Sequence, residues 1–510
     1  MAVITITPEI ALEELSTYAG GLGVLEGDKF LAAAKKGLKY YVLTLLYRHG
    51  YVEYSFDNET PTPKPQTHPI PPYKLLEPEE ELSIQLKGEN AIIRPWVFSL
   101  GNAKAVFFEG VCPYWVRNLT NRVYIENNED EKHYKYVLLA KAAAKYLQER
   151  IGLENISILD LQEAYTVLTM LALENNVSFR FIVHTPGPWG HPHFPARILH
   201  EEFGLNEKVG SVTLTEIGLK KALKVITVSK KHREITIETF NEYKHKISAI
   251  TNGISIDRWM HPLIKRLIGE KGVNNLTPDE LWRTHQRVRE ELLRLLSTFK
   301  PGIAEKKNWP IILWARRLSQ YKRPYFMKRL LEEEGGNIKA VIVLGGKAHP
   351  ADDKGLTYMR DFMKLHKSFD NVVYIPNYDL SVAKVMLSGS DIHLFTPFPG
   401  WEACGTSYMK TSINGVPSLA SRDGGALEIF KDGENSWFFG HEAKSFIDIY
   451  RDPEARKIDE EDYQDFKEKL QIIIKLWNSK EFREVSLNAL KTTLPKVDIE
   501  RILDKYYPPK

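Results

Sequence analysis

One lysine stands in an unusual setting, in the stretch GWEACGTSYMKTSING at residues 400–415. Lys410 follows Gly-Thr-Ser and precedes Asn-Gly, and the apolar residues Met409 and Ile413 flank it. A lysine on a solvated surface has polar neighbours and needs no glycines, whereas glycines let a ligand approach the backbone closely. The setting therefore indicates that a ligand comes close to this segment.

A second stretch, WARRLSQYKRPY at residues 314–325, concentrates positive charge. Arg316, Arg317, Lys322 and Arg323 lie within eight positions, with no acidic residue between them, and they follow an apolar run. Guanidinium forks and ammonium groups suit phosphate oxygens, although a solvated basic surface is the simpler alternative. Near such a cluster, a buried Lys410 could form a Schiff base with pyridoxal phosphate or bind phosphate directly.

Four further segments combine glycines with polar side chains. YAGGLGVLEGDKFLAAAKKG at residues 18–37 opens a helical pattern with closely spaced glycines, which suits an anion or a tight turn. GGKAHPADDKG at 345–355 and ITNGISIDRWM at 250–260 are glycine-containing turns. The loop HTPGPWGHPHFP at 184–195 carries His184, His191 and His193, but its prolines and glycines favour loop or substrate contacts over a metal site.

The elements that would position these segments alternate between strands and helices. Buried strands are predicted from short apolar runs at residues 181–185, 224–229, 311–315, 340–346, 372–376 and 391–397. Helical spacing is found at 324–334 and 381–389. This alternation predicts α/β architecture with doubly wound sheets, in which ligands bind at the carboxyl ends of strands. A stretch at 297–310 interrupts the pattern and predicts a domain boundary, and the tail from 498 onward is expected to be a helix that packs on the other half.

The bulk composition is typical of a globular protein with more than one domain. The 510 residues are 43% hydrophobic and 26% charged, and the formal net charge of +3 gives no support for a nucleic-acid or membrane partner. The only cysteines are Cys112 and Cys404, so neither a disulfide framework nor a structural zinc site is expected. The N-terminal residues lack the basic start of a signal peptide, and the expected location is the cytoplasm.

The order of these motifs resembles that of the α-glucan (glycogen or maltodextrin) phosphorylases, in particular their short bacterial and archaeal type. The motifs are YAGGLG, HTPGPWGHPHFP, ITNG with a following tryptophan, ARRLSQYKR, GKAHPAD and WEACGTSYMK, between about residues 5 and 440. The resemblance implies a GT-B-type α/β fold with two Rossmann-like, doubly wound domains facing a central cleft. The N-terminal domain would span 1–299 with the glycine loop and glucan contacts, and the C-terminal domain 300–510 with pyridoxal phosphate and the phosphate site.

The resemblance also implies roles for individual residues. Catalytic roles fall on Lys410, Arg317, Lys322 and His184. The expected contacts with pyridoxal 5'-phosphate, which Lys410 would hold as a Schiff base, are Lys410, Gly20, Gly21, Lys322, Trp259, Tyr378, Gly405 and Thr406. The expected substrate contacts are Leu22, His184, Asn252, Arg316, Arg317, Glu402, Cys404 and Gly405.

Three positions depart from the family pattern. Cys404 stands where serine is usual, which weakens one expected sugar hydrogen bond. Residues 162–165, Gln-Glu-Ala-Tyr, replace Asn-Asp/Glu-x-His on the acceptor side, and residues 423–426, Asp-Gly-Gly-Ala, replace Asp-Gly-x-Asn. Control by nucleotide or phosphorylation is not expected, because the long extensions that carry regulatory sites in larger relatives are not seen in these 510 residues.

The activity that the resemblance implies is phosphorolysis of α-1,4-glucan ends by inorganic phosphate, which releases glucose 1-phosphate with retention. The expected partners are glucan and phosphate, no metal is expected, and assembly into a homodimer is left open. Two alternatives are a GT-B glucosyltransferase that uses a nucleotide sugar, for which Lys410 would be incidental, and an inactive glucan-binding protein. A Schiff-base absorption band would separate the phosphorylase from the glucosyltransferase.

Overall fold

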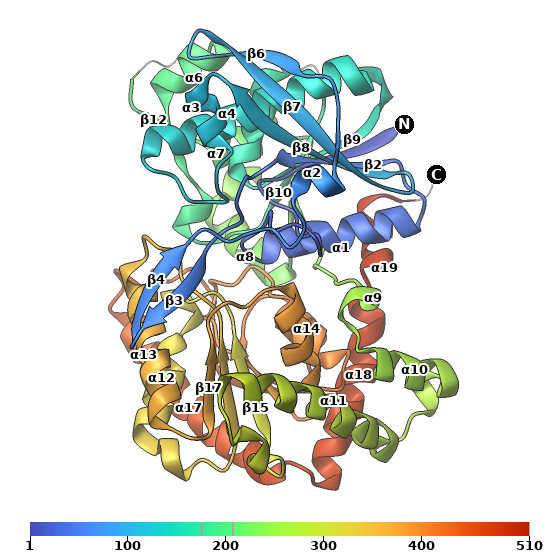
Figure 1. Ribbon diagram of the computed structural model, residues 1–510, viewed down its shortest axis with the longest axis vertical. Coiled ribbons are helices and arrows are strands. Elements are labelled where there is room, and N and C mark those ends of the chain that lie inside the picture. The colour runs from blue at the N-terminus through green and yellow to red at the C-terminus, as the bar shows by residue number, and fades with distance from the viewer. Residues whose placement is uncertain (175–176, 207–208, 509–510) are drawn as a thin grey trace. The chain divides into compact units, whose positions relative to one another are not determined.

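The computed structural model describes residues 1–174, 177–206 and 209–508. The chain divides into two compact units (Figure 1). The first unit comprises Met1–Tyr51, Pro65–Thr251 and Ile499–Lys510, and the second comprises Val52–Lys64 and Asn252–Asp498.

The first unit is built on a large mixed sheet whose order is β14-β13-β10-β9-β1-β2-β8-β7-β5, with β6 paired to β7. Its strands are β1 (Ala2–Ile6), β2 (Tyr40–Leu45), β5 (Glu77–Pro78), β6 (Leu82–Leu86), β7 (Glu89–Leu100), β8 (Ala103–Cys112), β9 (Ile156–Gln162), β10 (Arg180–Val183), β13 (Lys224–Thr227) and β14 (Ile247–Ala249). Pairing is parallel from β14 to β8 and antiparallel from β8 onward. β11 (His193–Pro195) and β12 (Ser211–Thr213) form a separate antiparallel pair.

The helices of the first unit include one contributed by the far end of the chain. They are α1 (Gly21–Lys35), α2 (Pro72–Leu75), α3 (Tyr114–Leu119), α4 (Glu129–Tyr146), α5 (Leu168–Ala172), α6 (Ala196–Phe203), α7 (Leu214–Lys221), α8 (Lys230–Thr239) and α19 (Ile499–Tyr506). The C-terminal α19 packs against α1 (Figure 1). The Tyr507 hydroxyl donates a 2.7 Å hydrogen bond to Asp160 in β9. The predicted helical tail is therefore confirmed.

The second unit contains a parallel sheet in the order β17-β16-β15-β18-β19-β20. Its strands are β15 (Ile311–Ala315), β16 (Val341–Gly345), β17 (Val372–Ile375), β18 (Ile392–Phe395), β19 (Ser418–Arg422) and β20 (Trp437–Glu442). The central strands are buried along their whole length, as expected for a sheet covered on both faces. The hairpin of β3 (Glu53–Asp57) and β4 (Thr60–Lys64) belongs to this unit, where Asn377 pairs with the backbone of Tyr54.

Helices surround this second sheet. They are α9 (Ile256–Trp259), α10 (Pro262–Lys271), α11 (Pro278–Phe299), α12 (Pro324–Glu334), α13 (Asp353–Ser368), α14 (Leu380–Gly389), α15 (Ser407–Ser412), α16 (Ala426–Ile429), α17 (Glu454–Leu476) and α18 (Lys480–Val497). α11 packs against both α14 and α18 (Figure 1). The six strands predicted from apolar runs and the two predicted helices are all confirmed, within one or two residues at most ends.

The division into units differs from the predicted domains 1–299 and 300–510. It falls at residues 251 and 252, so that α11 belongs to the second unit. The reason is a buried ionic contact: Arg289 of α11 lies 2.9 Å from Asp391, which directly precedes β18. Gly389 also lets α11 approach closely, because a Cβ there would lie 2.7 Å from Leu292. The break in periodicity at 297–310 is the end of a helix inside one unit.

None of the helices in the described ranges combines the length and apolar composition that a bilayer crossing requires.

Candidate active site

Lys410 lies in the short helix α15 and is almost completely buried, as its apolar neighbours predicted. Its Nζ lies 3.9 Å from the centroid of the Trp259 ring, which stabilises the charged amine where water is scarce. Asn414 links the two residues, because its Nδ2 donates to the backbone oxygens of Trp259 (2.9 Å) and Lys410 (2.8 Å). The backbones of Lys410 and Trp259 are thus held together by a buried amide.

Arg316 and Lys322 meet at one carboxylate, that of Glu402. Nη2 of Arg316 lies 2.6 Å and Nζ of Lys322 lies 3.3 Å from the same oxygen, Oε2 of Glu402. Burial raises the pKa of Glu402, but the two cations outweigh it and hold that pKa below its ordinary value. Burial, together with the neighbouring Arg316, lowers the pKa of Lys322 to about 7. The pair of cations around a single carboxylate leaves positive charge for an anionic ligand.

One buried donor in this group lacks a partner. Nη1 of Arg316 has no hydrogen bond within the described residues, although it is shielded from solvent. A buried N–H without a partner is unfavourable and is expected to be satisfied by a ligand. The guanidinium plane lies 4.4 Å from the centroid of Phe395, which fixes its direction.

The other two arginines of the basic stretch behave differently from each other. Arg317 is exposed and hydrogen-bonds Tyr321. Arg323 is fully buried, where its guanidinium lies 2.9 Å from Asp459 and 2.8 Å from Asp462. No acidic residue lies between the four cations in the sequence, yet three of them are paired with acids from elsewhere: Arg316 and Lys322 with Glu402, and Arg323 with two residues of α17 more than 130 positions further along.

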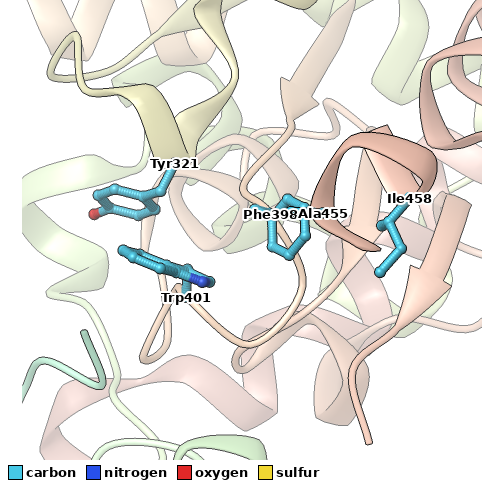
Figure 2. Close-up of a cluster of buried hydrophobic side chains, with 5 residues drawn as sticks. All are labelled: Tyr321, Phe398, Trp401, Ala455 and Ile458. Atoms are coloured by element: carbon cyan, nitrogen blue, oxygen red, sulfur yellow. The ribbon is translucent and has the colours of Figure 1, made fainter. Parts of the chain in front are cut away.

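An aromatic cluster holds the basic loop against the loop that carries Glu402 (Figure 2). Tyr321 stacks on Trp401 with 6.0 Å between ring centroids, and Phe398, Ala455 and Ile458 complete the cluster. The backbone N–H of Phe398 donates to the oxygen of Tyr321 at 2.7 Å, and the Thr396 hydroxyl donates to the oxygen of Lys322 at 2.8 Å. Lys322 and Glu402 are each adjacent to a residue of this cluster, so their positions are set by apolar packing.

Asp423 stabilises the loop from Glu402 to Thr406 through a hydrogen bond. This buried carboxylate accepts the backbone N–H of Glu402 at 2.8 Å, and burial raises the pKa of Asp423 to about 7. Gly405 has a φ of +75°, and a Cβ there would lie 2.5 Å from the Phe395 ring, so glycine is required for packing. Thr406 is the N-cap of α15, and its backbone oxygen accepts the N–H of Lys410.

The remaining predicted residues of the second unit lie in loops. Asn252 is buried, its backbone hydrogen-bonds the Cys404 thiol, and its Oδ1 has no partner within the described residues. Cys404 is itself buried beside Tyr408, with 3.9 Å between Sγ and the hydroxyl oxygen. Tyr378 follows β17, and its N–H donates to Pro376. Asn252 and Cys404, more than 150 positions apart in sequence, are thereby brought into contact.

In the first unit, the glycine loop forms the start of α1 as predicted. Gly20 is the N-cap and Gly21 begins the helix, which continues with Leu22. A Cβ at Gly20 or Gly21 would meet nothing within 4 Å among the described residues, so internal packing does not require these glycines. The carboxylate of Glu9 accepts the N–H groups of Ala19 and Gly20, a contact that the sequence pattern did not reveal.

The three histidines of the loop at 184–195 have different partners. His184 Nε2 lies 2.6 Å from Gln162, His191 Nδ1 lies 3.0 Å from Thr215, and His193 contacts Thr213. Burial, with Lys29 and His232 nearby, lowers the pKa of His184 well below its ordinary value. In the described part of the chain, no group of three or more histidine, cysteine or acidic side chains is arranged to hold a metal ion.

Comparisons with known proteins support the resemblance found in the sequence. Residues 328–506 match a family model described as carbohydrate phosphorylase. The chain is 26% identical to a maltodextrin phosphorylase of Thermococcus litoralis, over 97% of this chain and 68% of that protein. It is 26% identical to a glycogen phosphorylase of Mycobacterium tuberculosis (83% of this chain, 60% of that protein) and 25% identical to one of Aquifex aeolicus (86% and 76%). The predicted resemblance to the α-glucan phosphorylases is confirmed.

Proposed function

We propose that this chain, a relative of the short α-glucan phosphorylases, transfers glucosyl units from the ends of α-1,4-glucan to inorganic phosphate. The product would be glucose 1-phosphate, with the configuration retained. The observation that carries the proposal is the group of Arg316, Lys322 and Glu402, in which two largely buried cations share one carboxylate and one guanidinium N–H has no partner among the described residues. Such a group suits an oxyanion ligand, and the similarity to named phosphorylases supports phosphate as that ligand.

Pyridoxal 5'-phosphate fits the residues of the second unit. Lys410 would hold it covalently through its amine, and Trp259, which lies against that amine, would contact it as well. Further contacts would come from Gly405, Thr406, Lys322 and Tyr378. The partnerless Arg316 Nη1 and the buried Ser407 hydroxyl, which also lacks a partner in the described residues, are donors that suit phosphate oxygens. When bound, the cofactor supplies a phosphate group that can exchange a proton with the substrate phosphate. We include Gly20 and Gly21 of the first unit as further contacts.

The chain's own residues would then bind and orient the substrates and stabilise the negative charge of the reacting phosphate groups. Lys322, Arg317 and Arg316 would bind and orient inorganic phosphate, and their charge would stabilise the anions as the glycosidic bond breaks. The leaving glycosidic oxygen takes its proton from inorganic phosphate, and a phosphate oxygen forms the new bond to the sugar carbon. We assign sugar contacts to His184, Asn252, Glu402, Cys404, Gly405 and Leu22. In this proposal each unit is one Rossmann-like half of a GT-B fold.

The direct test is to incubate the purified protein with maltodextrin and inorganic phosphate and to assay glucose 1-phosphate. We expect product only when both substrates are present, and an absorption band from lysine-bound cofactor in the purified protein. Omission of phosphate is the control for hydrolysis. Glucan extension from a nucleotide sugar, without a chromophore, would instead identify a glucosyltransferase.

Cys404 gives a prediction with a small expected effect. Its thiol is buried and accepts the backbone N–H of Asn252, and burial raises its pKa to about 12. We expect Cys404→Ser to lower the free energy of unfolding by about 0.5–2 kcal/mol, because a hydroxyl loses more favourable hydration free energy than a thiol when it is buried. A sugar contact would change the affinity for glucose 1-phosphate by at most about tenfold. Melting temperature and glucose 1-phosphate affinity should be measured on the same variant, and lower stability with unchanged affinity would remove Cys404 from the sugar site.

A further inference from the structure

A line of buried polar groups in the first unit ends at His184. Thr5 in β1, Gln162 at the end of β9 and Glu26 in α1 are all fully buried. The Thr5 hydroxyl donates to Glu26 at 3.4 Å, Gln162 Nε2 donates to Thr5 Oγ1 at 3.0 Å, and Gln162 Oε1 lies 2.6 Å from Nε2 of His184. Lys29 lies 2.9 Å from Glu26 and completes the line with a charged group.

The donors and acceptors in this line can be assigned from its charged end. Glu26, paired with Lys29, is an acceptor for the Thr5 hydroxyl proton, and Thr5 then offers a lone pair to the amide N–H of Gln162. The amide nitrogen of Gln162 is therefore directed toward Thr5, and its oxygen toward His184. An amide oxygen can only accept, so Nε2 of His184 must carry the proton.

A second contact fixes the backbone of the same histidine. The carboxyl group of Glu163 accepts the backbone N–H of His184 and the hydroxyl proton of Thr185. Glu163 has a φ of +68°, a backbone conformation that is strained for this residue type. This conformation breaks the regular alternation of side chains that β9 has up to Gln162. Gln162 and Glu163 thus hold the ring and the backbone of His184 respectively.

We propose that Gln162 is a positioning residue that fixes the Nε2-protonated tautomer of His184, so that Nδ1 is left as a hydrogen-bond acceptor for a donating sugar hydroxyl. This inference rests on the proposed function for the identity of the ligand, and on the buried contacts alone for the tautomer. Nδ1 has no hydrogen bond within the described residues, and the side chain is only partly buried. The lowered pKa of His184 is consistent with a neutral ring.

The inference predicts a preference in the ligand. A neutral acceptor nitrogen can accept a hydrogen bond from a hydroxyl group. It forms no hydrogen bond to a carbon-bound hydrogen or to a fluorine in the same place. Among the monodeoxyglucose analogues, the one that lacks the hydroxyl facing Nδ1 of His184 should therefore bind more weakly than glucose to the wild-type protein, by about three- to tenfold. In Gln162→Leu, where the tautomer is no longer fixed, the difference between that analogue and glucose should shrink.

The tautomer can be read directly by NMR on protein labelled with 15N-histidine. The His184 signals are identified by their loss in His184→Asn. We expect a single Nε2-protonated neutral ring in the wild-type protein, a mixture of tautomers in Gln162→Leu, and a mixture also in Thr5→Val, which keeps the shape of the side chain but removes the group that orients the amide. Gln66→Leu is the matched control, because it removes another buried glutamine of the same unit, which accepts the Tyr51 N–H.

An Nδ1-protonated ring in the wild-type protein would overturn the proposal, as would a single unchanged tautomer in Gln162→Leu. Thr5→Val protects the test in case Gln162→Leu does not fold. The NMR result does not depend on phosphorolysis, so failure of the tautomer assignment is distinguishable from absence of glucose 1-phosphate formation. In the kinetic arm, Gln162→Leu should raise the KM for glucan about three- to tenfold and leave the KM for phosphate unchanged.

Discussion

Lys410→Ala should abolish both the bound cofactor and phosphorolysis while the protein remains folded. The amine of Lys410 is the group that would hold the cofactor, and it lies in a buried position against Trp259. Without it, no covalent link forms, so the absorption band of the purified protein should disappear. Glucose 1-phosphate formation should fall to background, because the phosphate group supplied by the cofactor is lost with it. Circular dichroism checks the fold.

The matched control is Lys347→Met, which removes another lysine of the second unit, one that is partly buried. Lys347 follows β16 and donates to the backbone oxygen of Val52, and burial lowers the pKa of Lys347 to about 8. Its neutral amine is therefore readily available, which makes Lys347 a second candidate for a covalent link. The chromophore should persist in Lys347→Met. If the band instead persists in Lys410→Ala and is lost in Lys347→Met, the cofactor assignment is wrong.

The sequence predicted local elements well because they depend on local patterns. β15 and α12 begin and end at the predicted residues, since a run of buried apolar residues and helical spacing after Pro324 are visible in a few positions. The domain boundary was less predictable. Assignment of α11 to the second unit depends on the contact between Arg289 and Asp391, about a hundred residues apart, which no local pattern reveals.

The same distinction holds for the candidate site. The burial of Lys410 could be predicted from its apolar neighbours, and the clustering of cations from the sequence ARRLSQYKR. The sequence could not show that Arg323 turns into the protein toward Asp459 and Asp462, whereas Arg316 turns toward Glu402. Arg323 has a φ of +55°, and this left-handed conformation ends the basic loop and begins α12. Nor could it reveal Asn414 as the link between Lys410 and Trp259, because both contacts are to backbone oxygens.

Lys322→Ala should weaken phosphate binding far more than glucan binding. Lys322 contributes a cation beside Arg316 whose side chain is only 12% exposed, and its loss from a site with little water should remove about 2–4 kcal/mol of transition-state stabilisation, or roughly a hundredfold or more in rate. Initial rates at varied phosphate and varied glucan separate the two effects. Lys354→Ala, which removes a surface cation that contacts Gln320 beside the same loop, is the control and should leave the phosphate KM unchanged. Unchanged phosphate affinity with a collapse of glucan affinity in Lys322→Ala would mean that the basic cluster binds sugar.

The pH dependence of anion binding gives this prediction a second, independent measurement. Burial, and then the neighbouring Arg316, lowers the pKa of Lys322 to about 7 when no ligand is bound, and an anionic ligand favours the charged amine. Above that pH the free protein must take up a proton to bind an anion, so the dissociation constant should rise with pH, approaching about tenfold per pH unit. Sulfate is the suitable probe, because its charge does not change in this range, whereas that of phosphate does. The pKa of the nearby Asp423 is also raised to about 7, so its titration is present in the wild-type protein and in the variant alike. The pH dependence that disappears in Lys322→Ala is therefore the part that belongs to Lys322, and an equally steep dependence in the variant would contradict its role as the titrating cation of the anion site.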